Sequence, residues 1–136
     1  MMTSFDTNDV LFQTLNASAG LKAMITGGIY TGKRPLNSTK EDICINTITV
    51  TRTYTPQSGT SNVNIYVPDK PLNHNGQEQK DINDTRLREI TGKVISLLEA
   101  ARVNGLSFWI SNQTDLAAPE IEQHYTNLRI DWNIQI

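Results

Sequence analysis

Hydrophobic residues recur most regularly between residues 81 and 105. They stand three or four positions apart and comprise Leu87, Ile90, Val94, Leu97, Leu98 and Ala101. This spacing places them on one side of an α-helix, and that side must be buried. Asp81 or Asn83 can accept hydrogen bonds from the first free amides, and Gly105 suits a left-handed helix end. The pattern therefore predicts one long helix.

Two residues of the predicted helix lie outside its hydrophobic stripe. At about 100° per residue, Gly92 projects roughly opposite the stripe and Ile95 lies on its flank. A glycine inside a helix costs on the order of 1 kcal/mol relative to alanine. Two interpretations stay open: the glycine is simply tolerated, or another backbone approaches the helix closely at this point.

The N-terminal region is predicted to form two short helical pieces. Asp6 or Thr7 can cap the first piece, and Ser18 can cap the second, which ends before Gly27 and Gly28. Both pieces carry apolar residues at helical spacing. We therefore expect one bent or interrupted helix that packs on the core.

The next segment is rich in β-prone residues. The alternation of apolar residues between positions 42 and 54 changes phase, which predicts a bulge or bend near Asn46 and Thr47. A second strand then carries apolar residues at every other position, namely Val63, Ile65 and Val67. These two strands are expected to form a long hairpin.

Two polar segments and two further strands complete the pattern. Residues 69–80 and 112–122 lack periodicity and are interpreted as surface loops, the first of them mobile. One strand begins at Leu106, and the last alternates regularly from Leu128 to Ile136. The resulting order, α-β-β-β-α-β-β, predicts a single α+β domain over residues 1–136. Its antiparallel or mixed β-sheet would be packed by an N-terminal helix and one long helix.

Composition and charge limit the kinds of partner. The chain has 136 residues, 38% of them hydrophobic, and a formal net charge of −2. Its 12 basic and 14 acidic side chains argue against tight nonspecific binding of nucleic acid. Sequence-specific binding of nucleic acid is not expected either. No apolar run approaches the roughly 20 residues of a membrane span, and no secretion signal is visible. We expect a cytoplasmic protein without a membrane partner.

One segment matches the spacing of a nucleotide-binding motif. Residues 27–33 satisfy the spacing of a phosphate loop, whose backbone amides and lysine hold a nucleotide. However, Arg34 stands where the motif needs a magnesium-binding hydroxyl, and Pro35 precedes a polar turn where the motif needs a helix. This segment is therefore interpreted as a helix end followed by a β-turn, and no nucleotide cofactor is expected.

The remaining reactive side chains predict no catalytic or metal site. His74 and His124 have no partners at metal-ligand spacing, and both are interpreted as solvated surface residues. Cys44 stands between two isoleucines and is interpreted as a small side chain in a strand rather than a reactive thiol. We therefore predict no catalytic residues, no cofactor and no metal.

Aromatic residues on the outer faces of strands point instead to association. Trp109 and Tyr66 each alternate with the apolar residues of their strands, so they face away from the main core. Exposed aromatic residues dominate many protein contacts. With Gly92 and Ile95 they form the set of interface candidates. The alternative is that a second layer, such as the N-terminal helix, covers the two aromatic residues.

Several segments in succession carry a resemblance to a known family. They are residues 26–32, 34–35, 43–50 and 62–68, followed by one long helix and a closing pair of strands. Over residues 10–136 this succession resembles the tail-completion proteins of long-tailed phages and prophages, with the lambdoid tail terminators as the nearest group. The resemblance rests on the order and character of the segments rather than on an invariant motif.

The resemblance implies a structural, non-enzymatic subunit. Such a protein would form a homo-oligomer, a hexameric ring, that caps the tail tube and contacts the tube protein and the head connector or a neck protein. It would be assembled in the bacterial cytoplasm and reside in the virion tail. Three alternatives stay open: a neck or head-closure protein, a monomeric adaptor that binds one partner protein, and a small enzyme using His74 or His124 with Tyr125.

Overall fold

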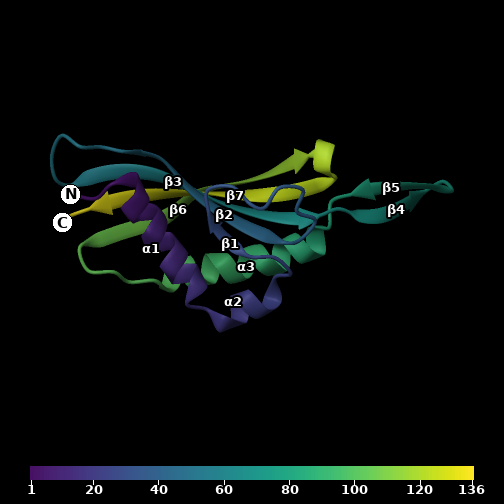
Figure 1. Ribbon diagram of the computed structural model, residues 1–136, viewed down its shortest axis with the longest axis horizontal. Helices are drawn as coiled ribbons and strands as arrows, with labels where there is room; N and C mark the ends of the chain where they lie inside the picture. Colours follow the sequence, from purple (N-terminus) through teal and green to yellow (C-terminus); the bar gives the residue numbers. More distant parts are fainter.

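The computed structural model describes residues 1–136 and shows an α+β fold (Figure 1). Its elements in chain order are α1 Ser4–Asn16, α2 Ala19–Met24, β1 Ile29–Thr31, β2 Asp42–Val50, β3 Gln57–Pro68, β4 Lys70–His74, β5 Gln77–Asp81, α3 Asp84–Ala100, β6 Leu106–Ala118, the 3-10 turn η1 Pro119–Ile121 and β7 Gln123–Ile134. The predicted fold class is confirmed, with the N-terminal helix divided in two.

The five main strands form one mixed sheet in the order β1-β2-β3-β7-β6. Strand β1 runs parallel to β2, and every other neighbouring pair is antiparallel. The three α-helices lie on the same side of this sheet (Figure 1). The sheet therefore has one face covered by helices and one face that no helix covers.

The core lies between the helices and the covered face of the sheet. Every second side chain is buried throughout β3 and, from Thr126 onward, in β7, including Ile65 and Ile130. Helix α3 adds Leu87, Ile90 and Val94 from its predicted stripe. Burying each such side chain contributes about 1.5–3 kcal/mol. This packing fixes α3 across the sheet.

The helix starts are set by polar caps. Thr3 caps α1 and forms a reciprocal pair with Asp6, so the predicted caps were wrong. Thr7 is instead buried within the helix, because its hydroxyl bonds to the core side of β2. The Ser18 hydroxyl accepts a hydrogen bond from the Leu21 amide, as predicted.

Helix α3 begins as predicted and ends earlier. The Asn83 side chain accepts a hydrogen bond from the Arg86 amide at the helix start. The chain leaves the helix at Ala101 in an extended conformation. Gly105, with φ of 78°, serves the turn before β6, where its carbonyl accepts a hydrogen bond from the Gln135 amide. The prediction that Gly105 ends the helix was therefore wrong.

A bulge interrupts β2, as the phase change predicted. The register with β3 shifts between Thr47 and Thr49. The Thr47 hydroxyl lies within hydrogen-bonding distance of Thr7 and Ser61 on the core side, while Ile48 is exposed. The extra residue thus lets β2 keep a polar contact inside and leaves an apolar side chain outside.

Both predicted loops were wrong. Residues 70–81 form a two-stranded hairpin, β4 and β5, that projects from the body of the protein (Figure 1). Its tip is Asn75-Gly76, both with positive φ, which is the turn chemistry that tight hairpins require. Residues 112–118 continue β6, and η1 connects β6 to β7. Polar composition concealed these strands, because neither buries a full face.

Candidate interaction surface

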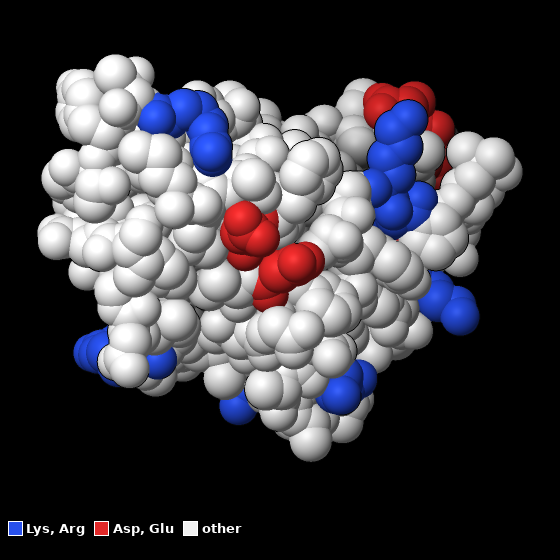
Figure 2. Space-filling model, turned by 60° about the vertical axis from the view of Figure 1, so that its left-hand side comes forward, with Lys and Arg blue, Asp and Glu red and all other residues white.

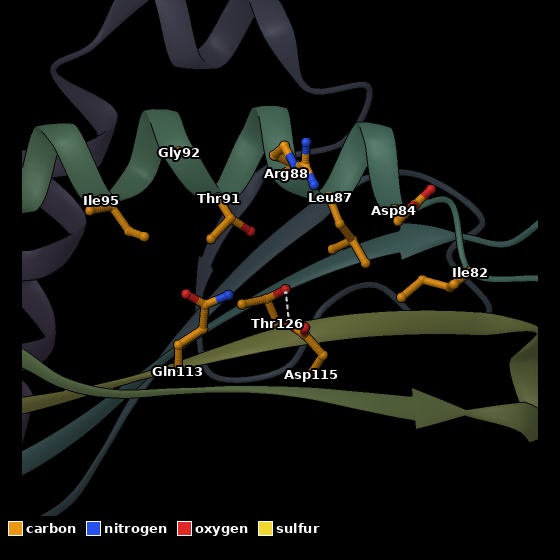
Figure 3. A pocket seen from close by; sticks show the side chains of 10 residues that line it. All are labelled: Ile82, Asp84, Leu87, Arg88, Thr91, Gly92, Ile95, Gln113, Asp115 and Thr126. Atoms are coloured by element: carbon orange, nitrogen blue, oxygen red, sulfur yellow. Dashed lines mark hydrogen bonds between the residues drawn. The ribbon is translucent and has the colours of Figure 1, made fainter.

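A groove separates α3 from the outer strand β6 (Figure 3). Its volume is about 390 Å³, and it is lined by Ile82, Asp84, Leu87, Arg88, Thr91, Gly92, Ile95, Gln113, Asp115 and Thr126. The helix supplies one wall, and β6 and β7 supply the other. The groove exists because the apolar stripe of α3 packs on the central strands and leaves the second half of β6 uncovered.

Gly92 lies in the helical wall of this groove. A Cβ atom added there would meet nothing within 4 Å. No other backbone of the same chain approaches it, so a close approach at this glycine could come only from another chain. The half-buried Ile95 lines the groove beside it. The wall thus combines free space with an apolar side chain that the core only partly covers.

Thr91 places an unpaired hydroxyl in the groove. Its side chain points toward Gln113 and Thr126 (Figure 3), and the residue is 6% exposed. The Thr91 Oγ1 atom is buried and has no hydrogen-bond partner. Thr126, by contrast, donates to the Asp115 carboxylate at 2.9 Å. Leaving a buried hydroxyl unpaired costs about 1–3 kcal/mol. The wall of the groove therefore contains one polar atom that the chain leaves without a partner.

The charged residues of the groove are few and of both signs. Arg88 is exposed and forms no ion pair, and Asp115 is also exposed. Asp84 contacts Lys70 at 3.6 Å. Figure 2 likewise shows charged side chains scattered singly or in small groups over one face of the molecule, without a broad area of one sign. This surface suits a partner of mixed charge rather than a polyanion.

Strand β6 is an unprotected sheet edge. It has 13 residues, and its only charged residue is Asp115. Edge strands are commonly blunted by lysine, proline or short length, because their free backbone groups invite pairing with other chains. Trp109 and Leu116 are 50% and 40% exposed along β6. This edge therefore suits pairing with another strand.

The opposite edge of the sheet has its own apolar residues. Strand β1 pairs only with positions 43–45 of β2, so the remainder of β2 is also an edge. Ile48 is exposed there, and Phe5 on α1 and Tyr54 after β2 are more than two-thirds exposed. The molecule thus carries two different apolar surfaces, one at each edge of the sheet.

The uncovered face of the sheet is polar and aromatic. Tyr66 stacks on Tyr125 with ring centroids 4.8 Å apart, and the Arg34 guanidinium lies 4.4 Å from the centre of the Tyr66 ring. Burial raises the pKa of Tyr66. The Asn127 amide donates to the side chains of Asn62 and Asn64. No helix forms a second layer, and Arg34 partly covers Tyr66 instead.

Arg34 holds the segment between β1 and β2 in place. Its Nε donates to the buried Asp42 carboxylate at 2.9 Å, and its Nη1 donates to Gln123. Asp42 also accepts from the Ser38 hydroxyl and the Gly28 amide. Residues 27–33 contain β1 and are not followed by a helix, so they form no phosphate loop, and a short strand stands where a β-turn was predicted. Arg34 therefore binds a carboxylate of its own chain.

A second charged network ties α3 to the rest of the fold. The Arg86 Nε donates to the Glu41 carboxylate at 2.6 Å, and its Nη2 donates to the Met24 carbonyl. The hydrogen bond with Glu41 raises the pKa of Arg86. Sequence reasoning missed both arginine networks, because the partners lie far apart in the chain and no local pattern links them.

The reactive side chains are placed as follows. His74 is exposed on the hairpin, as predicted, whereas His124 is partly buried and its Nδ1 lies 2.6 Å from the Asp69 carboxylate. The prediction of a solvated His124 was therefore wrong, because the turn before β4 brings Asp69 beside it. Cys44 is buried, and burial raises the pKa of its thiol.

No group of three potential metal ligands occurs. None of the helices is long and apolar enough to cross a membrane.

The predicted interface residues do not form one patch. Gly92 and Ile95 come together in the groove. A second hollow, at the C-terminal end of α3, is lined by Leu98, Glu99, Arg102, Phe108, Trp109 and Ile110. Trp109 borders this hollow, but it alternates with Phe108 and Ile110, which pack on the core, and its side chain lies on the uncovered face of the sheet opposite Asp131. Tyr66 also lies on the uncovered face, apart from Gly92 and Ile95.

The comparisons with known proteins show a likeness of fold. No protein-family model matches the chain, and no curated protein matches it. A chain from the solved structure "Virion of native gene transfer agent (GTA) particle" is similar, with a TM-score of 0.59 and 13% sequence identity. The match covers 93% of this chain and 92% of that chain. At this identity, the likeness shows a shared fold alone.

Proposed function

We propose that this protein is a structural, non-enzymatic subunit of a phage-like virion. The observation that carries the proposal is the likeness of fold, over nearly the whole of both chains, to a chain from a gene transfer agent virion. More specifically, residues 1–136 form one domain that assembles as a hexameric ring, caps the tail tube and joins it to the head connector or a neck protein. Assembly takes place in the bacterial cytoplasm.

The two edges of the sheet support a ring. Subunits of a closed ring contact each other through two different patches, so each subunit must present two complementary surfaces. One is the groove between α3 and β6, with Gly92 and Ile95. The other is the side of α1 and β2, with Phe5 and Ile48. Two distinct apolar surfaces are what a head-to-tail contact needs.

The test is assembly with and without tail tubes. The purified protein is measured by light scattering, then mixed with tubes from the same phage or prophage and imaged by electron microscopy. A ring that binds only the ends of tubes supports the proposal. A particle that binds the connector and ignores tubes would indicate a neck or head-closure protein. A monomer that binds one partner under all conditions would make it an adaptor.

A further inference from the structure

We propose that the groove between α3 and β6 receives the β4–β5 hairpin of a second copy of this chain. The inference rests on the proposed ring, because each subunit would give its hairpin to one neighbour and receive a hairpin from the other. It assigns an occupant to a groove that contains an unpaired buried hydroxyl and borders a free sheet edge.

The hairpin lacks support within its own chain. Its strands form a separate sheet, and residues 71–80 are exposed except for the partly buried Leu72. An isolated two-stranded hairpin is marginally stable in water, so such an arm gains from a partner. Each of its strands has one edge without backbone partners. The hairpin is therefore a free arm with unused hydrogen-bonding capacity.

The hairpin points away from its own groove. Ile82 and Asp84, which follow β5 directly, line the start of that groove. The arm extends in the opposite direction, beyond the body of the protein (Figure 1). The turn at positions 82 and 83 would have to reverse before the arm could fold back. A neighbouring copy, by contrast, can receive the arm without any change in this turn.

The hairpin and the free edge of β6 match in length and in unpaired backbone groups. Strands β4 and β5 have five residues each, so each spans roughly 17 Å. Beyond the bulge near Ser111, residues 112–118 of β6 offer a free edge at least as long. Pairing there would satisfy backbone groups on both chains. The side chains of Gln113 and Asp115 would flank the added strand on the groove side.

The charged side chains without ion pairs are also complementary between the hairpin and the groove. Glu78 and Lys80 are exposed, form no ion pairs and lie two positions apart on one side of β5. The groove presents Arg88 and Asp115, one charge of each sign. The hairpin is otherwise rich in asparagine and glutamine, whose amides both donate and accept. Such amides can pair with the exposed side chains of Gln113 and Asp115 in the groove.

Mixed disulfide formation tests the contact. In a Cys44→Ser background, the Asn75→Cys variant is mixed with Gly92→Cys, with Gln113→Cys or, as a control, with Lys22→Cys, an exposed position on α2 outside the groove. After mild oxidation, disulfide-linked peptides are measured by mass spectrometry. The proposal predicts at least tenfold more linkage from Asn75→Cys to one of the two groove positions than to the control. Mixing separate single-cysteine proteins ensures that every measured linkage joins two copies.

The outcomes separate this inference from the proposed ring. Ring-sized particles without linkage to either groove position would overturn the hairpin contact and leave the ring intact. A monomeric wild-type protein, alone and with tubes, would overturn both. Charge reversal gives a second readout: Arg88→Glu weakens assembly at least tenfold, and adding Glu78→Arg to the same chain restores it. Failure of this rescue, combined with absent linkage, contradicts the contact.

Discussion

The two sides of helix α3 differ in burial: one packs in the core, and the other lines the groove. On one side, Leu87, Ile90 and Val94 are buried against the sheet. On the other, Gly92 faces empty space and Ile95 is only partly covered. Both sides belong to one 17-residue helix with ordinary caps. The difference therefore comes from the width of the sheet that α3 covers, not from the helix itself.

Because of this difference, we expect one side of α3 to determine the stability of the subunit and the other side to determine its association. Residues on the buried side contribute to the monomer core, so their replacement should unfold the protein. Residues on the groove side contribute little to that core, and their replacement should change assembly while the subunit stays folded. The same substitution made on both sides should therefore have different effects on stability and on assembly.

The largest expected effect is that of Ile90→Ala. Ile90 is fully buried, so the substitution should lower the free energy of unfolding by about 2–5 kcal/mol. Ile95→Ala is the matched control, because it removes the same atoms from the groove side. It should cost clearly less stability and weaken association more. Urea unfolding of the two variants measures the difference, and equal losses of stability would contradict the comparison.

A smaller effect is expected from Thr91→Val. Replacing the unpaired hydroxyl by a methyl group of similar shape should stabilise the isolated subunit by about 1–3 kcal/mol. Because the hydroxyl is enclosed in the wall of the groove, the same change should leave assembly unchanged. Thermal unfolding measures the stability of the subunit, and sedimentation measures its assembly. A loss of subunit stability would show that the hydroxyl is already satisfied in the monomer.

A still smaller effect on stability is expected from Gly92→Gln. Added helix propensity should raise the free energy of unfolding by up to about 1 kcal/mol, because the new side chain meets open space. Ala100→Gln, an exposed position of the same helix outside the groove, is the control. Unfolding in denaturant checks both variants. A destabilised Gly92→Gln subunit would mean that the groove wall is not free.

No effect at all is expected from nucleotides. Arg34 binds Asp42, and residues 27–33 lead into a strand, so no phosphate cradle is formed. Calorimetry with ATP or GTP should give no saturable binding, and Lys33→Ala should not change the result. Saturable binding that the Lys33→Ala substitution abolishes would contradict this interpretation.

Sequence patterns predicted those parts of the fold that bury a full face. The stripe of α3, the alternation of β3 and β7 and the bulge in β2 all follow from apolar periodicity. The hairpin and the second half of β6 bury little, so no periodicity marked them. Only the Asn75-Gly76 pair carried a local signal for the hairpin.

The candidate surface was predictable in part. Gly92 and Ile95, which line the groove, were identified because each departs from the buried pattern of α3. Thr91 was missed, since its burial depends on strands that are distant in the chain. The exposed edge of β6 was missed for the same reason. A sequence does not state which strand ends a sheet.

The mass of the protein in solution shows whether the groove side of α3 forms a contact between subunits. Light scattering at micromolar concentration is applied to the wild-type protein and to Gly92→Gln, each alone and with tail tubes. We expect a wild-type mass several times the 15.2 kDa of one chain and a smaller, still folded particle for the variant. A wild-type monomer under both conditions, or a variant with unchanged mass, would contradict it.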